Sequence, residues 1–152
     1  MVAVFAFVIP SVRGNWGVQT FTLPAYVPGQ STSVTSQSFS VYLASDQGLY
    51  GTVQSTQPVW VMIVTASDHD TAMHDGANGF NDLRSNDLSK LGEVTQLTNP
   101  NPLHWNKCHF IYSWSNVLDC YPDGQYYLVF VNTGDFSATV TINIYVAEMP
   151  QS

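Results

Sequence analysis

Residues 125–131 read Gln-Tyr-Tyr-Leu-Val-Phe-Val, and residues 138–147 read Ala-Thr-Val-Thr-Ile-Asn-Ile-Tyr-Val-Ala. The second run alternates, with Val140, Ile142, Ile144 and Val146 on one face and polar residues or tyrosine on the other. A period of two is typical of a strand with one buried face. The intervening Asn-Thr-Gly-Asp at 132–135 predicts a hairpin turn, so this third of the chain is expected to be an antiparallel hairpin.

The same patterns recur toward the N-terminus. Residues 38–43 alternate with Phe39, Val41 and Leu43 inward, while Pro58–Ala66 is a continuous apolar run, expected to be a central strand buried on both faces. Further strands are expected at residues 18–23, 49–54 and 109–114. About eight strands separated by turn signals predict an all-β fold, an antiparallel β-sandwich or jelly roll.

One long segment does not fit a strand. Residues 68–91 are polar and lack alternation, and apolar residues within them could support short helical turns (Phe80, Leu83, Leu88 and Leu91). The prolines at 100 and 102 are expected to interrupt the chain again. We therefore expect one sandwich domain over residues 14–152, preceded by an apolar N-terminal strand within residues 1–13.

Composition excludes several classes of protein. A net charge of −7 and the lack of a basic stripe argue against binding to nucleic acid. No apolar run reaches the ~20 residues that a membrane-spanning helix needs. Charged residues make up only 10%, against a typical ~25%, and aromatic residues reach 13%. This balance is typical of a β-rich extracellular protein.

Charge is also unevenly placed along the chain. Arg13 and Asp46 are the only charged side chains before residue 68. Charged surface residues normally oppose self-association, so this half of the chain has little to prevent it. Two interpretations remain: a neutral Ser/Thr-rich surface, or a surface that is covered by other copies of the chain.

The two cysteines, Cys108 and Cys120, lie in a segment without a CxxC motif. Their spacing suits a hairpin-sized loop, so a disulfide is a better prediction than a metal or redox site. In the chain-entropy model such a loop stabilises the fold by roughly 3 kcal/mol. A disulfide would place the chain outside the cytosol.

The densest polar cluster follows the central strand. Oxygen ligands from Asp68, Asp70, Asp75 and Asp82 could suit Ca²⁺, although the spacing is not that of an EF-hand. His69 and His74 are five positions apart, which misses the spacing of a helical zinc pair. The alternative is a solvated acidic loop without a metal.

No catalytic motif is present, and the candidate carboxylate pairs all lie in this one loop, so we expect no enzyme. Aromatic residues near the cysteines are a second candidate surface, for sugars or a protein partner. They could equally be core residues of the sandwich. These residues are Trp105, Tyr112, Trp114, Tyr121, Tyr126 and Tyr127.

The closing hairpin carries a resemblance. Residues 123–134 and 138–145, with the earlier run at 58–68, resemble small extracellular β-sandwich modules of the Golgi-dynamics type. The resemblance covers residues 38–147 and implies a sandwich fold, but it implies no particular function. The segment around the cysteines and the long insertion at 68–107 depart from the pattern of these modules.

The first nine residues contain no polar side chain. They form a short run without a basic lead, so a strand is a better prediction than a signal peptide. A strand apolar on both faces could complete either the sheet of its own chain or that of a neighbouring copy. The second arrangement resembles donor-strand assembly in archaeal surface filaments. The expected assembly residues are Val2, Val4, Phe5, Phe7, Val8 and Ile9.

Two functions therefore follow from the sequence. The first is a structural subunit of an extracellular filament, pilus or tube whose partner is the chain itself. The alternative is a monomeric secreted module that binds carbohydrate or another ligand. Neither function requires a cofactor, and calcium is the cofactor that the acidic segment could bind.

Overall fold

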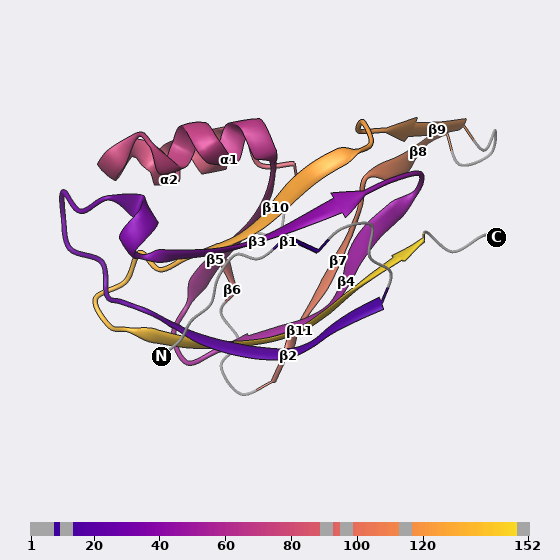
Figure 1. Cartoon of the computed structure of the whole chain (residues 1–152). Coiled ribbons are helices and arrows are strands. Elements are labelled where there is room, and N and C mark those ends of the chain that lie inside the picture. The colour runs from indigo at the N-terminus through magenta and orange to yellow at the C-terminus, as the bar shows by residue number, and fades with distance from the viewer. Residues whose placement is uncertain (1–7, 10–13, 89–92, 95–98, 113–116, 149–152) are drawn as a thin grey trace.

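The computed structural model describes residues 8–9, 14–88, 93–94, 99–112 and 117–148. Two β-sheets pack face to face, and short helices cover the outer side of one of them (Figure 1). Every strand pair in the described residues is antiparallel except one. The predicted all-β sandwich is therefore confirmed.

The first sheet, which we call the helix-covered sheet, has the strand order β1-β3-β10-β5-β6. These strands are β1 (Val8–Ile9), β3 (Ser36–Leu43), β10 (Gly124–Val131), β5 (Val59–Thr65) and β6 (Glu93–Val94). The exceptional pair is β1 with β3, which run parallel.

The second sheet, which we call the open sheet, has the order β2-β11-β4-β7. Its strands are β2 (Gly14–Leu23), β11 (Ala138–Glu148), β4 (Gln47–Ser55) and β7 (Asn101–Asn106). A separate hairpin is formed by β8 (Cys108–Tyr112) and β9 (Val117–Cys120). The helices are η1 (Thr32–Val34), α1 (Ala66–Met73), η2 (Gly76–Asn78) and α2 (Gly79–Ser85).

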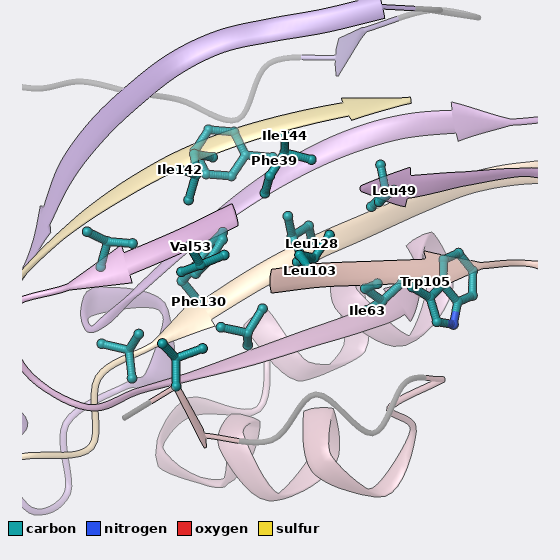
Figure 2. Packing of buried hydrophobic residues seen from close by; sticks show 14 of the residues in the cluster. Phe39, Leu49, Val53, Ile63, Leu103, Trp105, Leu128, Phe130, Ile142 and Ile144 are labelled. Atoms are coloured by element: carbon teal, nitrogen blue, oxygen red, sulfur yellow. The ribbon is translucent and has the colours of Figure 1, made fainter. Parts of the chain in front are cut away.

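The main core lies between the two sheets (Figure 2). The alternation read from the sequence sets its inward faces, since Phe39, Val41 and Leu43 of β3 are all buried there. In β11 the four aliphatic positions from Val140 to Val146 are buried in the same way. The rings of Phe21, Phe39 and Phe130 meet with centroids 5.3 to 6.0 Å apart and tie β2 to β3 and β10.

Strand β5 is buried on both faces, as its continuous apolar run predicts. Val61 and Ile63 face the main core, whereas Met62 and Val64 belong to a second core beneath the helices. Ala72 of α1 and Leu83 of α2 close this second core from above. The helices thus give an apolar cover to the outer face of β5 and of its neighbour β10.

The polar segment after β5 contains more helix than its pattern suggests. Helix α1 begins at Ala66, directly after the strand, and the Oγ1 atom of Thr65 accepts a hydrogen bond from the backbone N–H of Asp68 at 3.2 Å. Such an N-terminal cap supplies a partner for one of the free N–H groups of the first turn. The expected short helical turns are therefore found here, and they start earlier than expected.

Strand β7 differs from the sequence prediction, in which Pro100 and Pro102 interrupt regular structure. The structure places Pro102 inside β7, which is the last strand of the open sheet. Proline lacks a backbone N–H but is tolerated in an edge strand, because no further strand needs that donor. Leu103 and Trp105 alternate into the core and anchor the strand.

Two polar side chains hold the closing hairpin in place. The buried amide of Asn132 donates to the carbonyl oxygens of Pro24 and Phe136 at 3.0 and 2.8 Å, and its Oδ1 accepts from the N–H of Gly134 at 2.9 Å. At the other end of β10, the hydroxyl of Tyr126 donates to the carbonyl of Pro122. The bonds of Asn132 therefore order the turn at 132–136 and join it to the residue that follows β2.

Candidate functional site

The acidic residues predicted to bind calcium are spread over three elements. Asp68 and Asp70 lie on α1, Asp75 precedes η2, and Asp82 lies on α2. Only Asp75 and Asp82 are brought into direct contact: a hydrogen bond between their carboxyl groups raises the pKa of Asp82 above its ordinary value, with burial and charge repulsion adding to the shift. Asp70 instead lies 3.5 Å from the ring of His74, and both are well exposed.

The described part of the chain contains no group of three or more His, Cys, Asp or Glu side chains placed to hold one metal ion. The Asp75–Asp82 pair is therefore a two-carboxylate contact to which main-chain or amide oxygens would have to be added for calcium. Calcium binding by this segment stays a prediction.

His69 makes a contact that its sequence position did not suggest. Its Nε2 lies 2.7 Å from the Oγ of Ser38 on β3, and its ring stacks on Tyr127 of β10 with centroids 3.8 Å apart. Burial lowers the pKa of His69, although the nearby Asp70 acts in the opposite direction. The imidazole is thus held in its neutral form between α1 and the helix-covered sheet.

A serine hydroxyl beside an imidazole is also the first contact of a nucleophile–base pair. Such a pair needs a third group that orients the base, and a space for substrate beside the hydroxyl. Ser38 is almost fully buried, and among the described residues no carboxylate hydrogen-bonds the other ring nitrogen of His69. The contact therefore anchors α1 to the sheet.

The predicted disulfide is present. Cys108 and Cys120 lie directly opposite each other in the β8–β9 hairpin, with their sulfur atoms 2.00 Å apart. The hairpin continues from β7 and ends beside the start of β10 (Figure 1). The covalent bond closes this extension.

A buried lysine fixes the base of the hairpin and was missed by sequence reasoning. The Nζ atom of Lys107 lies 2.7 Å from the carboxylate of Asp123 and donates to the carbonyl of Tyr121 at 3.3 Å. The lysine side chain is 2% exposed, whereas that of Asp123 is 53% exposed. The hydrogen bond from Lys107 lowers the pKa of Asp123, and the carboxylate also accepts the N–H of Ser45 at 3.0 Å.

The predicted aromatic surface is largely internal. Trp105 and Tyr126 are buried, Tyr121 is half-buried and stacks near Trp105, and Tyr127 is covered by His69. The side chain of Tyr112 and all of Trp114 lie outside the described residues. These aromatic residues mainly serve the core and its borders.

A different aromatic row crosses the outer face of the open sheet. Tyr50 of β4 lies between Tyr145 of β11 and His104 of β7, with ring centroids 6.0 and 4.8 Å away. The rings are close to parallel, at 28° and 35°, so each covers a face of its neighbour. Because sugars stack on ring faces, this row offers little free platform.

The N-terminal run reaches its own sheet. Val8 and Ile9 pair with Ser40 and Val41, which makes β1 the edge of the helix-covered sheet. The other predicted assembly residues lie outside the described residues: Val2, Val4, Phe5 and Phe7. Within the described residues, β1 pairs with two of the eight residues of β3.

The edges formed by β1 and β3 and by β2 lie on the same side of the sandwich, as the contact between Phe21 of β2 and Phe39 of β3 shows. We call the side formed by β1, β2 and β3 the uncharged side. Its strands span residues 8–9, 14–23 and 36–43 and contain no charged side chain.

The opposite side carries the devices that natural proteins use to protect sheet edges. Proline lies in the edge strand β7 at Pro102, and the edge strand β6 carries Glu93. Asp87 accepts the N–H of Ile63 at 3.3 Å, and Leu88 donates to the carbonyl of Ile63 at 2.8 Å, so these residues cover the border of β5. We call this the protected side.

Comparison with known proteins adds no relative: no family model, no curated protein sequence and no solved structure matches this chain.

Proposed function

We propose that this chain is the structural subunit of an extracellular filament, pilus or tube, and that its copies join through the N-terminal strand. The observation that carries the proposal is the uncharged side of the sandwich. Natural sheet edges are normally blunted by charge, proline or a covering segment, and among the described edge strands charge and proline occur on the protected side but not on the uncharged side. A subunit that must accept a strand from a copy of itself needs one side without them.

The pairing of β1 with β3 supports the N-terminal segment as the added strand. Val8 and Ile9 already use the β3 edge within one molecule. The same backbone bonds can be made by residues 1–9 of a second copy, which is strand exchange of the domain-swapping kind. Because the donor segment and the acceptor edge are different surfaces, the contact is heterologous and continues into a filament.

One further finding agrees with an extracellular location. The Cys108–Cys120 disulfide is the kind of bond that persists outside the reducing cytosol. In addition, none of the described helices is both long and apolar enough to cross a membrane.

The proposal is tested by removing residues 1–9 and, separately, by changing Val18→Lys on β2. Val18 is 66% exposed, so the substitution adds charge to the uncharged side without disturbing the core. We expect the unmodified chain to form polymers in light scattering and negative-stain images, and both variants to remain monomeric. His104→Lys is the matched control on β7, at the protected side, and should still assemble.

Circular dichroism of each variant shows whether the sandwich has folded. A folded, unmodified chain that stays a 16.8 kDa monomer at high concentration would contradict the proposal. Polymers formed equally well without residues 1–9 would contradict the role of the N-terminal strand, while leaving the uncharged side as the contact.

A further inference from the structure

A cavity of about 260 Å³ lies at the end of the molecule where α2 approaches the start of β3 and the end of β10. It lies away from the β1–β3 pairing, and in Figure 1 α2 marks this end. The residues that line it are Tyr26, Thr32, Thr35, Ala77, Phe80, Asn81, Val131 and Thr133.

The lining contains no charged side chain. A phosphate, a carboxylate or a metal ion would gain no charged partner there, so the lining favours a neutral ligand. The lining combines hydroxyl and amide groups with two aromatic rings and an apolar floor at Val131. This mixture suits a neutral molecule that is polar at its edges and apolar on its faces.

Three polar side chains at the cavity are available to a ligand. The hydroxyls of Tyr26 and Thr133 and the amide of Asn81 make no hydrogen bond to other described residues. The deeper threonines are already committed: Thr32 accepts the backbone N–H of Phe80 at 2.9 Å, and the hydroxyl of Thr35 contacts the carbonyl of Thr32 at 3.5 Å. The cavity thus contains two kinds of polar side chain: threonines that are hydrogen-bonded within the fold, and other groups that can bind a ligand.

The wall formed by α2 is fixed in position. A Cβ atom at Gly79 would lie 2.4 Å from the carbonyl oxygen of Ala72 and 3.0 Å from the side chain of Thr32, so only glycine permits this approach. The ring of Phe80 packs edge-on against Trp60, and the guanidinium of Arg84 lies over both rings. The cavity is therefore formed before any ligand arrives, which reduces the cost of binding.

We propose that this cavity binds one neutral sugar ring, such as the terminal residue of a glycan. A pyranose ring presents C–H faces to Tyr26 or Phe80 and hydroxyls to Tyr26, Asn81 and Thr133. A single ring covers little surface, so the expected dissociation constants are millimolar. The site is independent of the uncharged side and of strand exchange.

The test uses the full chain and four probes: glucose, galactose, mannose and N-acetylglucosamine. Chemical shifts or calorimetry should report millimolar binding of at least one of them. The variant carrying Tyr26→Phe and Asn81→Ala should bind that sugar at least tenfold more weakly at an unchanged melting temperature. Matched controls outside the cavity, Tyr42→Phe and Asn143→Ala, should bind it like the unmodified chain.

Glucose 6-phosphate provides the charge control and should bind more weakly than the neutral sugars. Absence of binding by all four probes would overturn the proposal. Binding that survives the double variant would place the sugar elsewhere and overturn it as well. Equal binding of glucose 6-phosphate would contradict the argument from the neutral lining.

Discussion

His69 on α1 and Ser38 on β3 are joined by a 2.7 Å contact between Nε2 and Oγ, across 31 positions of sequence. With the ring stacked on Tyr127, the histidine is one of the few polar links between the helices and the sheet beneath them. Protonation of His69 should therefore weaken the contact between α1 and the helix-covered sheet.

Acid should weaken the fold through His69. Burial lowers its pKa in the folded state, so the unfolded chain binds the proton more tightly as the pH falls. The stabilisation is fully present above the unfolded value of about 6.5 and is lost as the pH falls toward the folded value. Urea unfolding should show a lower free energy of unfolding at about pH 5 than at about pH 7.5. In His69→Gln this difference between the two pH values should be smaller.

His74→Gln is the control for that experiment, because the His74 side chain is 78% exposed and makes only a surface contact with Asp70. A pH dependence that is the same in His69→Gln as in the unmodified chain would show that other groups cause it.

The carboxyl pair formed by Asp75 and Asp82 should destabilise the fold at neutral pH. The raised pKa of Asp82 means that the folded state favours its protonated form, so this stabilisation is present at low pH and lost as the pH rises through the folded value. Asp82→Asn should raise the melting temperature at pH 7 and have little effect in strong acid.

Calcium gives the same pair a second test. If the two carboxylates share a cation, millimolar Ca²⁺ should raise the melting temperature of the unmodified chain and leave that of Asp82→Asn unchanged. Asp135→Asn, an exposed change in the hairpin turn, is the matched control.

The ion pair between Lys107 and Asp123 should stabilise the base of the hairpin. Lys107→Ala removes a buried stem and leaves the carbonyl of Tyr121 without a donor, a loss of about 2 kcal/mol in the free energy of unfolding. Lys107→Met keeps most of the packing and should cost less. Asp123→Asn should cost more than Lys107→Met, because it leaves the ammonium of Lys107, whose side chain is 2% exposed, without its counter-charge. Chemical denaturation of the three variants measures the order.

Asn132 should be the most sensitive polar residue in the closing hairpin. Asn132→Ala leaves the carbonyls of Pro24 and Phe136 and the N–H of Gly134 without their partner, which should cost about 3 kcal/mol. Thr139→Ala, a change at an exposed position of β11, should stay within about 0.5 kcal/mol of the unmodified chain. Equal losses in both variants would show that the turn is not held by the asparagine side chain.

The sequence predicts the sandwich well where one face of a strand is buried. Strands β3, β5, β10 and β11 follow directly from their alternating or continuous apolar runs. Strand β7 could not be read in this way, because only its edge position makes Pro102 acceptable. Helix α1 could not be predicted either, because its eight residues bury little beyond Ala72 and therefore show no apolar stripe.

Less of the candidate sites than of the fold could be predicted from the sequence. Spacing correctly suggested the Cys108–Cys120 bond, because both partners lie in one hairpin. The Ser38–His69 contact and the carboxyl pair of Asp75 and Asp82 depend on how separate elements pack, and no local pattern encodes them. The low charge of the first 67 residues was visible in the sequence, but only the strand order gathers it onto one side of the sandwich.

The strand order also governs how the chain can fold while it is being made. Strands β2 and β3 pair with β11 and β10, which come from the last third of the sequence. During synthesis, the charge-poor half therefore leaves the ribosome long before the strands that complete its sheets. Nascent chains close to one another could pair there instead, so protection at this stage, by a chaperone or by spacing of ribosomes, would decide the yield of correctly folded subunits.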